Sequence, residues 1–167
     1  MNFEIRHCSV LDAGADIIVN AANNNLMQGG GVCGAIFERA GAKELEEECC
    51  KCGFVATGSA VITQGLNSGA KYIIHAVGPR IWANKYDWEE RLSDAYLNSL
   101  KIAESKEVES IAFPCISIGI YGCPIREATE IAINTIKNFE AKHLKICYLC
   151  CFTEEEFEIY NELRDKI

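Results

Sequence analysis

The pattern of apolar positions along the chain predicts alternating strands and helices. Three segments are continuous apolar runs: Ile17-Ile18-Val19, Tyr72-Ile73-Ile74 and Ile111-Ala112-Phe113. Continuous runs of this kind are typical of strands that are covered on both faces. Together with shorter β-like segments, they predict strands over residues 3–8, 16–20, 59–63, 72–77, 110–115 and 145–152.

Helical periodicity fills the intervals between these strands. Residues 32–50 are predicted as one helix, and residues 87–106 place an apolar stripe at helical spacing. Pro124 suits the first position of a third helix. Thr153 and Glu156 have the spacing of a capping box, which predicts the start of a last helix. The alternation predicts an α/β protein: a three-layer α/β/α sandwich with a central mixed, mostly parallel twisted sheet.

Length and composition limit the class of protein. A chain of 167 residues with 49% hydrophobic and 24% charged residues is expected to form one soluble globular domain spanning residues 1–167. It contains no apolar run long enough to span a membrane and no signal-peptide pattern, so we expect a cytoplasmic protein without a membrane partner. The net charge of −8 argues against a nucleic-acid partner, because such a surface repels phosphate backbones.

Ten cysteines raise the question of a disulfide framework or a metal site. Cys147 and Cys150 lie in a predicted strand, where side chains three residues apart point to opposite faces, unlike a zinc knuckle. We therefore expect reduced, buried thiols there and no metal. The cluster Cys49-Cys50-x-Cys52 is less distinct, and a metal remains an alternative for it.

Two glycine-rich segments, residues 20–32 and 114–122, are the main indication of chemistry. Each follows an apolar strand-like run and leads into a helical pattern. Such loops present backbone N–H groups to phosphates at the carboxyl ends of strands. Neither loop contains Lys or Arg, which predicts a diphosphate held by amides rather than by cations.

Two common nucleotide motifs fit poorly. Residues 29–34 match G-x-G-x-x-G, but eight residues separate them from the predicted strand that ends at Asn20. No acidic residue ends a second strand at the required distance, so an NAD-dependent oxidoreductase is a weak alternative. A Walker loop is excluded because the chain has no Gly-Lys-Ser/Thr sequence.

Five segments taken together resemble the macro domain, in order and spacing. They are Ile18-Val-Asn-Ala-Ala-Asn23, Gly29-Gly-Gly-Val32, Gly34-Ala-Ile36, Ile74-His-Ala-Val-Gly-Pro79 and Ala112-Phe-Pro-Cys-Ile-Ser-Ile-Gly-Ile-Tyr-Gly122. The resemblance runs from about residue 8 to residue 163 and is greatest to the stand-alone bacterial branch. It implies that the ligand is ADP-ribose or O-acetyl-ADP-ribose, with an ADP-ribosylated protein as a further partner. It implies no cofactor and no metal, and leaves the oligomeric state open.

The resemblance also implies a set of site residues. Asn23 would orient the distal ribose, with Cys33 and Tyr121 beside the attacked carbon as the other catalytic positions. Phe152 would pack against adenine. The expected ligand-binding residues are Ser9, Val10, Ala22, Asn23, Gly30, Gly31, Val32, Cys33, Ser117, Ile118, Gly119, Ile120, Tyr121 and Phe152. Two simpler interpretations stay open: Asn23 holding its turn, and His75 as a structural strand residue.

Three positions depart from the family pattern. Ser9 stands where an aspartate would contact the adenine amino group, and Ile118 replaces a threonine. Cys33 stands where hydrolytic members of the bacterial branch carry an aspartate, and a thiol is a poor general base. A helix N-terminus favours the thiolate, so one hypothesis is a reactive Cys33; the alternative is a small side chain tolerated in the loop.

Two functions follow from this resemblance. The first is hydrolysis of an ester at the distal ribose: deacetylation of O-acetyl-ADP-ribose, or removal of mono-ADP-ribose from proteins. The second is a non-catalytic reader of ADP-ribose or ADP-ribosylated proteins, which the replacement of the usual aspartate by Cys33 favours.

Overall fold

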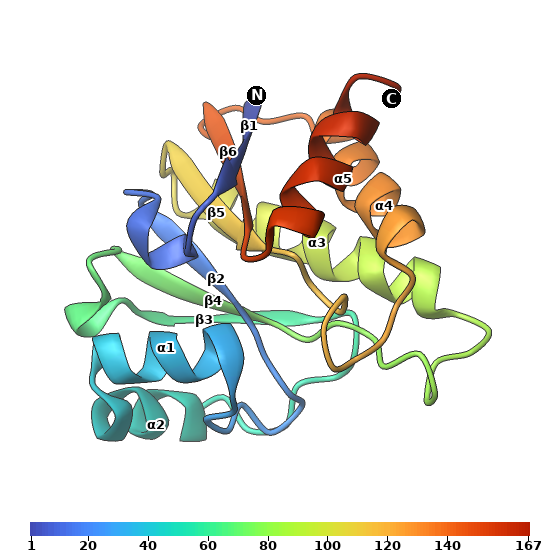
Figure 1. The fold of residues 1–167 in the computed structure, drawn as a ribbon. Coiled ribbons are helices and arrows are strands. Elements are labelled where there is room, and N and C mark those ends of the chain that lie inside the picture. Colours follow the sequence, from blue (N-terminus) through green and yellow to red (C-terminus); the bar gives the residue numbers. More distant parts are fainter.

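The computed structural model describes all residues, 1–167, and contains a six-stranded sheet (Figure 1). Its strands in chain order are β1 (Asn2–His7), β2 (Ile17–Ala21), β3 (Ala60–Gln64), β4 (Tyr72–Ala76), β5 (Ser110–Pro114) and β6 (Ile146–Cys151). The spatial order is β1-β6-β5-β2-β4-β3. Only the pairing of β3 with β4 is antiparallel, so the predicted mixed, mostly parallel sheet is confirmed.

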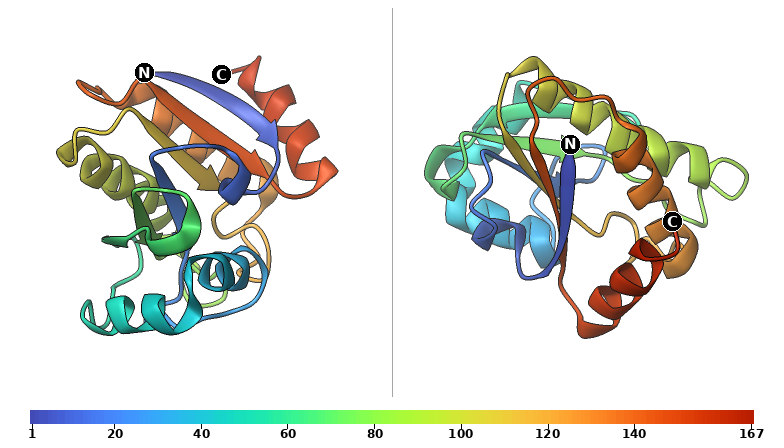
Figure 2. Two further views of the ribbon diagram at one scale, coloured as in Figure 1. Left: turned by 90° about the vertical axis from the view of Figure 1, so that its left-hand side faces the viewer. Right: turned by 90° about the horizontal axis from the view of Figure 1, so that it is seen from above.

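Helices cover both faces of the sheet. The helices are α1 (Gly31–Ala40), α2 (Ala42–Cys50), α3 (Trp88–Ser105), α4 (Ile125–Asn138) and α5 (Glu154–Arg164), with short 3-10 turns η1 (Val10–Asp12) and η2 (Leu66–Ser68). Figures 1 and 2 show α1 and α2 on one side and α3, α4 and α5 on the other. No helix is long and apolar enough to cross a lipid bilayer.

The core is divided into two clusters by the alternation of side chains along the strands. Ile17 and Val19 join the cluster beneath α3, α4 and α5, whereas Ile18 packs with α1 and α2. Cys147 and Cys150 divide in the same way, which confirms that their side chains point to opposite faces.

The remaining cysteines are also free thiols. Burial raises the pKa of Cys49 to about 12, so this thiol stays protonated at neutral pH. Its neighbour Cys50 is exposed, and no three metal-ligating side chains of the chain converge on one point.

One helix prediction was wrong. The segment 32–50 is two helices rather than one, because Gly41 adopts a φ of +106° between α1 and α2. The Gly41 N–H closes α1 on the carbonyl oxygen of Phe37, and the chain then turns before α2. The capping box is confirmed, since Thr153 Oγ1 accepts from the Glu156 N–H and the Glu156 carboxylate accepts from the Thr153 N–H.

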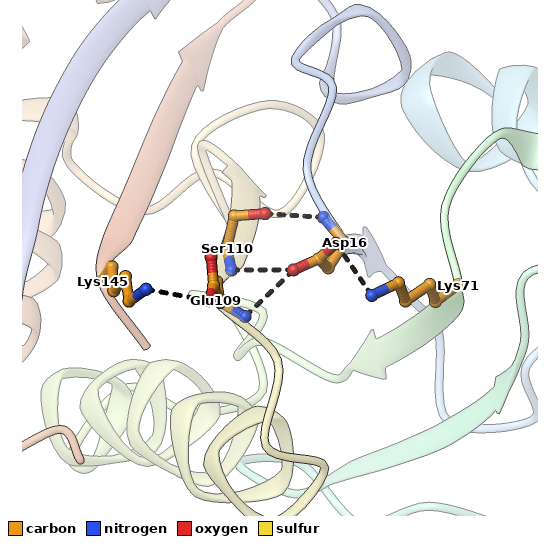
Figure 3. A network of polar contacts seen from close by, with 5 residues as sticks. All are labelled: Asp16, Lys71, Glu109, Ser110 and Lys145. Carbon is orange, nitrogen blue, oxygen red and sulfur yellow. Dashed lines mark hydrogen bonds and ion pairs between the residues drawn. The ribbon is translucent and has the colours of Figure 1, made fainter. Parts of the chain in front are cut away.

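A polar network joins the amino ends of the central strands (Figure 3). Asp16 precedes β2, and its Oδ2 accepts hydrogen bonds from the backbone N–H groups of Glu109 and Ser110 at 3.0 and 3.3 Å. The hydroxyl of Ser110 accepts the Asp16 N–H at 2.7 Å. Lys71, before β4, pairs with Asp16 Oδ1 at 3.4 Å. The network therefore fixes three strand starts at the end of the sheet opposite the glycine-rich loops.

Candidate functional site

A cleft lies at the carboxyl ends of β2, β5 and β6. It consists of a smaller cavity of about 170 Å³ and a larger one of about 500 Å³. The two adjoin, because both are lined by Ala21, Gly31, Val32, Cys115 and Gly119. Both glycine-rich segments contribute to this shared wall, as expected for a parallel sheet whose loops meet at one edge.

The first loop runs from the end of β2 to the start of α1. Asn23 spans it with two hydrogen bonds: its Nδ2 donates to the carbonyl oxygen of Met27 at 2.9 Å, and its Oδ1 accepts the Met27 N–H at 3.0 Å. Asn23 thus holds the turn and also lines the larger cavity. The amides at the start of α1 have no carbonyl partner within the helix, so they are available to an anion.

The close packing of this loop explains one of its glycines. A side chain at Gly34 would bring its Cβ within 2.6 Å of the Gly29 carbonyl oxygen. Only glycine therefore allows α1 to start this close to the loop that precedes it.

The second loop connects β5 to α4. Ser117 has a φ of +65°, and its carbonyl oxygen accepts the Cys123 N–H at 3.0 Å, which closes the loop. The loop rests on Gly78, where a Cβ would lie 2.2 Å from Ser117 Oγ. Gly119, Ile120 and Tyr121 line the larger cavity from this side.

The smaller cavity contains the residues of the expected adenine end. Ser9, Val10 and Phe152 line it, and the Phe152 side chain is 80% exposed. Ser9 Oγ already accepts the Leu11 N–H at 3.2 Å as the cap of η1. The one carboxylate in this wall is Glu156, whose Oε2 accepts the Phe152 N–H at 2.9 Å.

The larger cavity brings Asn23, Cys33 and Tyr121 together with Arg80. Cys33 lies in the first turn of α1, is 7% exposed, and points its Sγ at the Met27 carbonyl oxygen, 3.7 Å away. The wall contains neither a carboxylate nor a histidine. No side chain in it is therefore an ordinary general base.

Arg80 was not found by sequence reasoning. It comes from the loop after β4, and its Nη2 donates to the Tyr121 hydroxyl at 3.3 Å. The guanidinium carbon also lies 4.9 Å from the centre of the Tyr121 ring. The two glycine-rich loops carry no cation, as noted above, but this third loop adds one to the same cleft. Cys8, Cys150 and Glu156 were missed as lining residues because they belong to no glycine-rich motif, and Cys115 was missed although it lies within the second glycine-rich segment.

His75 is structural, as its place in a strand suggested. The side chain is fully buried in β4 between Asn20 Nδ2, 3.0 Å from Nδ1, and Thr63 Oγ1, 2.9 Å from Nε2. Burial lowers the pKa of His75 to about 4, so the ring is neutral at physiological pH.

Comparison with known proteins agrees with this geometry. Residues 19–132 match the family model described as "Macro domain". The chain belongs to the macro domain family.

Relatives of this macro domain cover almost its whole length. An O-acetyl-ADP-ribose deacetylase of Escherichia fergusonii is 47% identical over 155 residues, covering 89% of this chain and 86% of the relative. The macrodomain of Oceanobacillus iheyensis, solved with ADP, is 36% identical with a TM-score of 0.89, covering 99% of this chain and 93% of that one. The Trypanosoma brucei macrodomain in complex with ADP-ribose is 34% identical with a TM-score of 0.88, covering 98% and 69%.

The fold also argues against the dinucleotide fingerprint. In this macro domain β2 ends at Ala21 and α1 begins at Gly31, so the glycines at 29–34 do not form the tight strand-to-helix turn of that motif. The oxidoreductase alternative loses its structural support.

Most of the expected site residues line the cleft. Ala22 and Ile118 are the exceptions: Ala22 is buried and donates its N–H to the Ala76 carbonyl oxygen, and Ile118 packs against the core. The roles of all these residues toward a ligand remain predictions. A separate hollow of about 600 Å³ between α3 and α4 is larger than either cavity, but it contains no residue of the family motifs.

Proposed function

We propose that this chain is a single macro domain that binds ADP-ribose and hydrolyses an ester at the distal ribose. The observation that carries the proposal is the continuous cleft, with an exposed aromatic ring at one end and Asn23, Cys33 and Tyr121 at the other. The relatives named for O-acetyl-ADP-ribose deacetylation or solved with ADP and ADP-ribose support this ligand.

Each part of the ligand has a complementary wall. Adenine stacks on Phe152, and the diphosphate lies against the amides of Gly31, Val32 and Gly119, which both cavities share. The distal ribose then reaches Asn23, whose amide both donates and accepts hydrogen bonds.

Hydrolysis in this cleft would proceed without a protein carboxylate. Water attacks the acyl carbonyl carbon, the bond from that carbon to the ribose oxygen breaks, and the products are a carboxylic acid and ADP-ribose. Because the larger cavity holds no carboxylate or histidine, we infer that a phosphate oxygen of the bound substrate and the loop backbone orient the water. The substrates would be O-acetyl-ADP-ribose or proteins carrying mono-ADP-ribose on an acidic side chain.

The second candidate is a non-catalytic reader of ADP-ribose or ADP-ribosylated proteins. Cys33, in place of the usual aspartate, favours this candidate: its side chain is nearly buried and points at a backbone carbonyl oxygen.

One experiment separates the two. Calorimetric titration with ADP-ribose is followed, on the same sample, by a deacetylation assay with O-acetyl-ADP-ribose. Binding with turnover supports the hydrolase, and binding without turnover supports the reader. Absence of binding would overturn both.

A further inference from the structure

Arg80 is a cation without an anionic partner inside the cleft. It lines the larger cavity and forms no ion pair within 4.0 Å, unlike Arg6, Arg91, Arg126 and Arg164. A guanidinium has five N–H donors, and the side chain of Arg80 makes one hydrogen bond, to the Tyr121 hydroxyl. The remaining donors are available to a bound anion.

Hydrogen bonds hold the backbone of the loop at Arg80, the residue that carries this guanidinium. The Arg80 N–H donates to Asn84 Oδ1 at 3.2 Å, and its carbonyl oxygen accepts the N–H groups of Ala83 and Asn84 at 3.0 and 2.9 Å. The next N–H, of Ile81, donates to the Tyr121 carbonyl oxygen at 2.9 Å. The loop after β4 is thus joined to the second glycine-rich loop, and the rings of Trp82 and Tyr121 lie nearly perpendicular with their centres 6.3 Å apart.

Arg80 lies apart from the amides that are proposed to hold the diphosphate. The amides proposed to hold the diphosphate belong to residues that line both cavities, whereas Arg80 lines only the larger one. Its contacts are with Tyr121, at the far end of the second loop from the adenine end. The charge therefore faces whatever is attached to the distal ribose.

The rest of the larger cavity adds no opposing charge. No Asp or Glu lines it, and Cys33 stands where relatives of the bacterial branch are expected to carry a carboxylate. A negative substituent would meet one unpaired cation and no repelling anion. Because the chain has a net charge of −8, its surface does not attract anionic ligands from a distance. A positive side chain inside the cleft therefore selects between ligands by direct contact.

We propose that Arg80 makes this site selective for distal-ribose esters whose acyl group carries a second, free carboxylate, such as the half-ester of a dicarboxylic acid. This inference rests on the proposed hydrolase function and names its substrate class. The planar guanidinium of Arg80 would bind the free carboxylate through two parallel N–H donors. Its contact with Tyr121 would hold the guanidinium and the Tyr121 hydroxyl beside the ester.

The test compares hydrolysis of O-succinyl-ADP-ribose, which carries the extra carboxylate, with that of O-acetyl-ADP-ribose. We expect kcat/KM to be at least tenfold higher for the succinyl ester. In Arg80→Gln the ratio of the two values falls toward one. Arg80→Lys, which keeps the charge but loses the fork, retains part of the preference. Lys85→Gln, which removes an exposed cation of the same loop, leaves the ratio unchanged.

Two kinetic results would overturn the proposal: a wild-type ratio at or below one, or a ratio that Arg80→Gln does not change. A titration with ADP, which lacks the distal ribose, gives a further check. If Arg80→Gln lowers the affinity for ADP as much as the affinity for the succinyl ester, Arg80 binds the diphosphate and the proposal fails. If the wild-type protein hydrolyses neither ester, the hydrolase proposal fails instead, and the dissociation constants of the two esters still test the charge preference.

Discussion

The Sγ atom of Cys33 lies 3.7 Å from the carbonyl oxygen of Met27, in the first turn of α1 and at the wall of the larger cavity. A thiol there donates a weak hydrogen bond into the loop and leaves the cavity without a carboxylate. The distal end of the cleft therefore differs in charge from that of a site with aspartate at this position.

Replacing Cys33 by Asp should raise turnover of O-acetyl-ADP-ribose by about tenfold or more, because a positioned general base contributes about 10²–10⁴ in rate. The measurement is kcat under saturating substrate. Cys33→Asn, similar in size but uncharged, serves as the matched control and should not show the increase. Unchanged turnover in Cys33→Asp would mean that other groups activate the water.

Cys33 should react slowly with iodoacetamide at neutral pH, because its side chain is 7% exposed. Cys50 is exposed and provides the internal reference in the same sample. Mass spectrometry of digested protein gives both labelling rates. A Cys33 that is labelled faster than Cys50, and that ADP-ribose protects, would support the reactive-thiol hypothesis against this expectation.

Phe152→Ala should weaken ADP-ribose binding by about tenfold, since stacking of a base on an aromatic ring is worth about 1–3 kcal/mol. Phe54 is a matched control: it is also exposed, at 71%, but lines neither cavity. Calorimetry on both alanine variants provides the test. Equal affinities of Phe152→Ala and the wild type for ADP-ribose would show that adenine does not stack on this ring.

Stability should fall as the pH decreases from about 6.5 to 4 because of His75. Burial lowers the pKa of this imidazole to about 4, whereas the unfolded chain takes up the proton near pH 6.5. In that window the unfolded state binds more protons, so the loss reaches about 3 kcal/mol at the lower end. Urea titrations across this pH range measure it. If a His75→Gln variant loses unfolding free energy with decreasing pH as steeply as the wild type, other groups cause the effect.

Asp16→Asn should destabilise the protein at pH 7 by about 1.5–3 kcal/mol, the usual contribution of hydrogen bonds to a charged group. Burial acts to raise the pKa of Asp16, but the Glu109 N–H and the Lys71 ammonium outweigh it, and the pKa is lowered. Its stabilisation is therefore complete above about pH 4 and is lost as the pH falls through the lowered pKa. The difference in unfolding free energy between variant and wild type should shrink there; a constant difference would contradict the charge argument.

The sequence alone was sufficient for the alternation of strands and helices, the mostly parallel sheet and the position of the two glycine-rich loops at one edge of that sheet. Continuous apolar runs such as Ile17-Ile18-Val19 predict strands that are buried on both faces, and the capping box at Thr153 predicts the start of a helix. Both are local properties, readable without the rest of the chain. The break at Gly41 was missed because glycine is tolerated within a helix, and its φ of +106° depends on how α1 and α2 pack.

Only the tertiary structure placed Arg80 beside Tyr121. Arg80 lies 41 residues before Tyr121 and outside every motif, so no spacing along the chain connects them. Their proximity follows from the sheet order, which brings the ends of β4 and β5 to either side of β2. The charge of a cleft depends on side chains from several loops that lie close together in the folded protein. The sequence gives the identity of each side chain but not the distances between them.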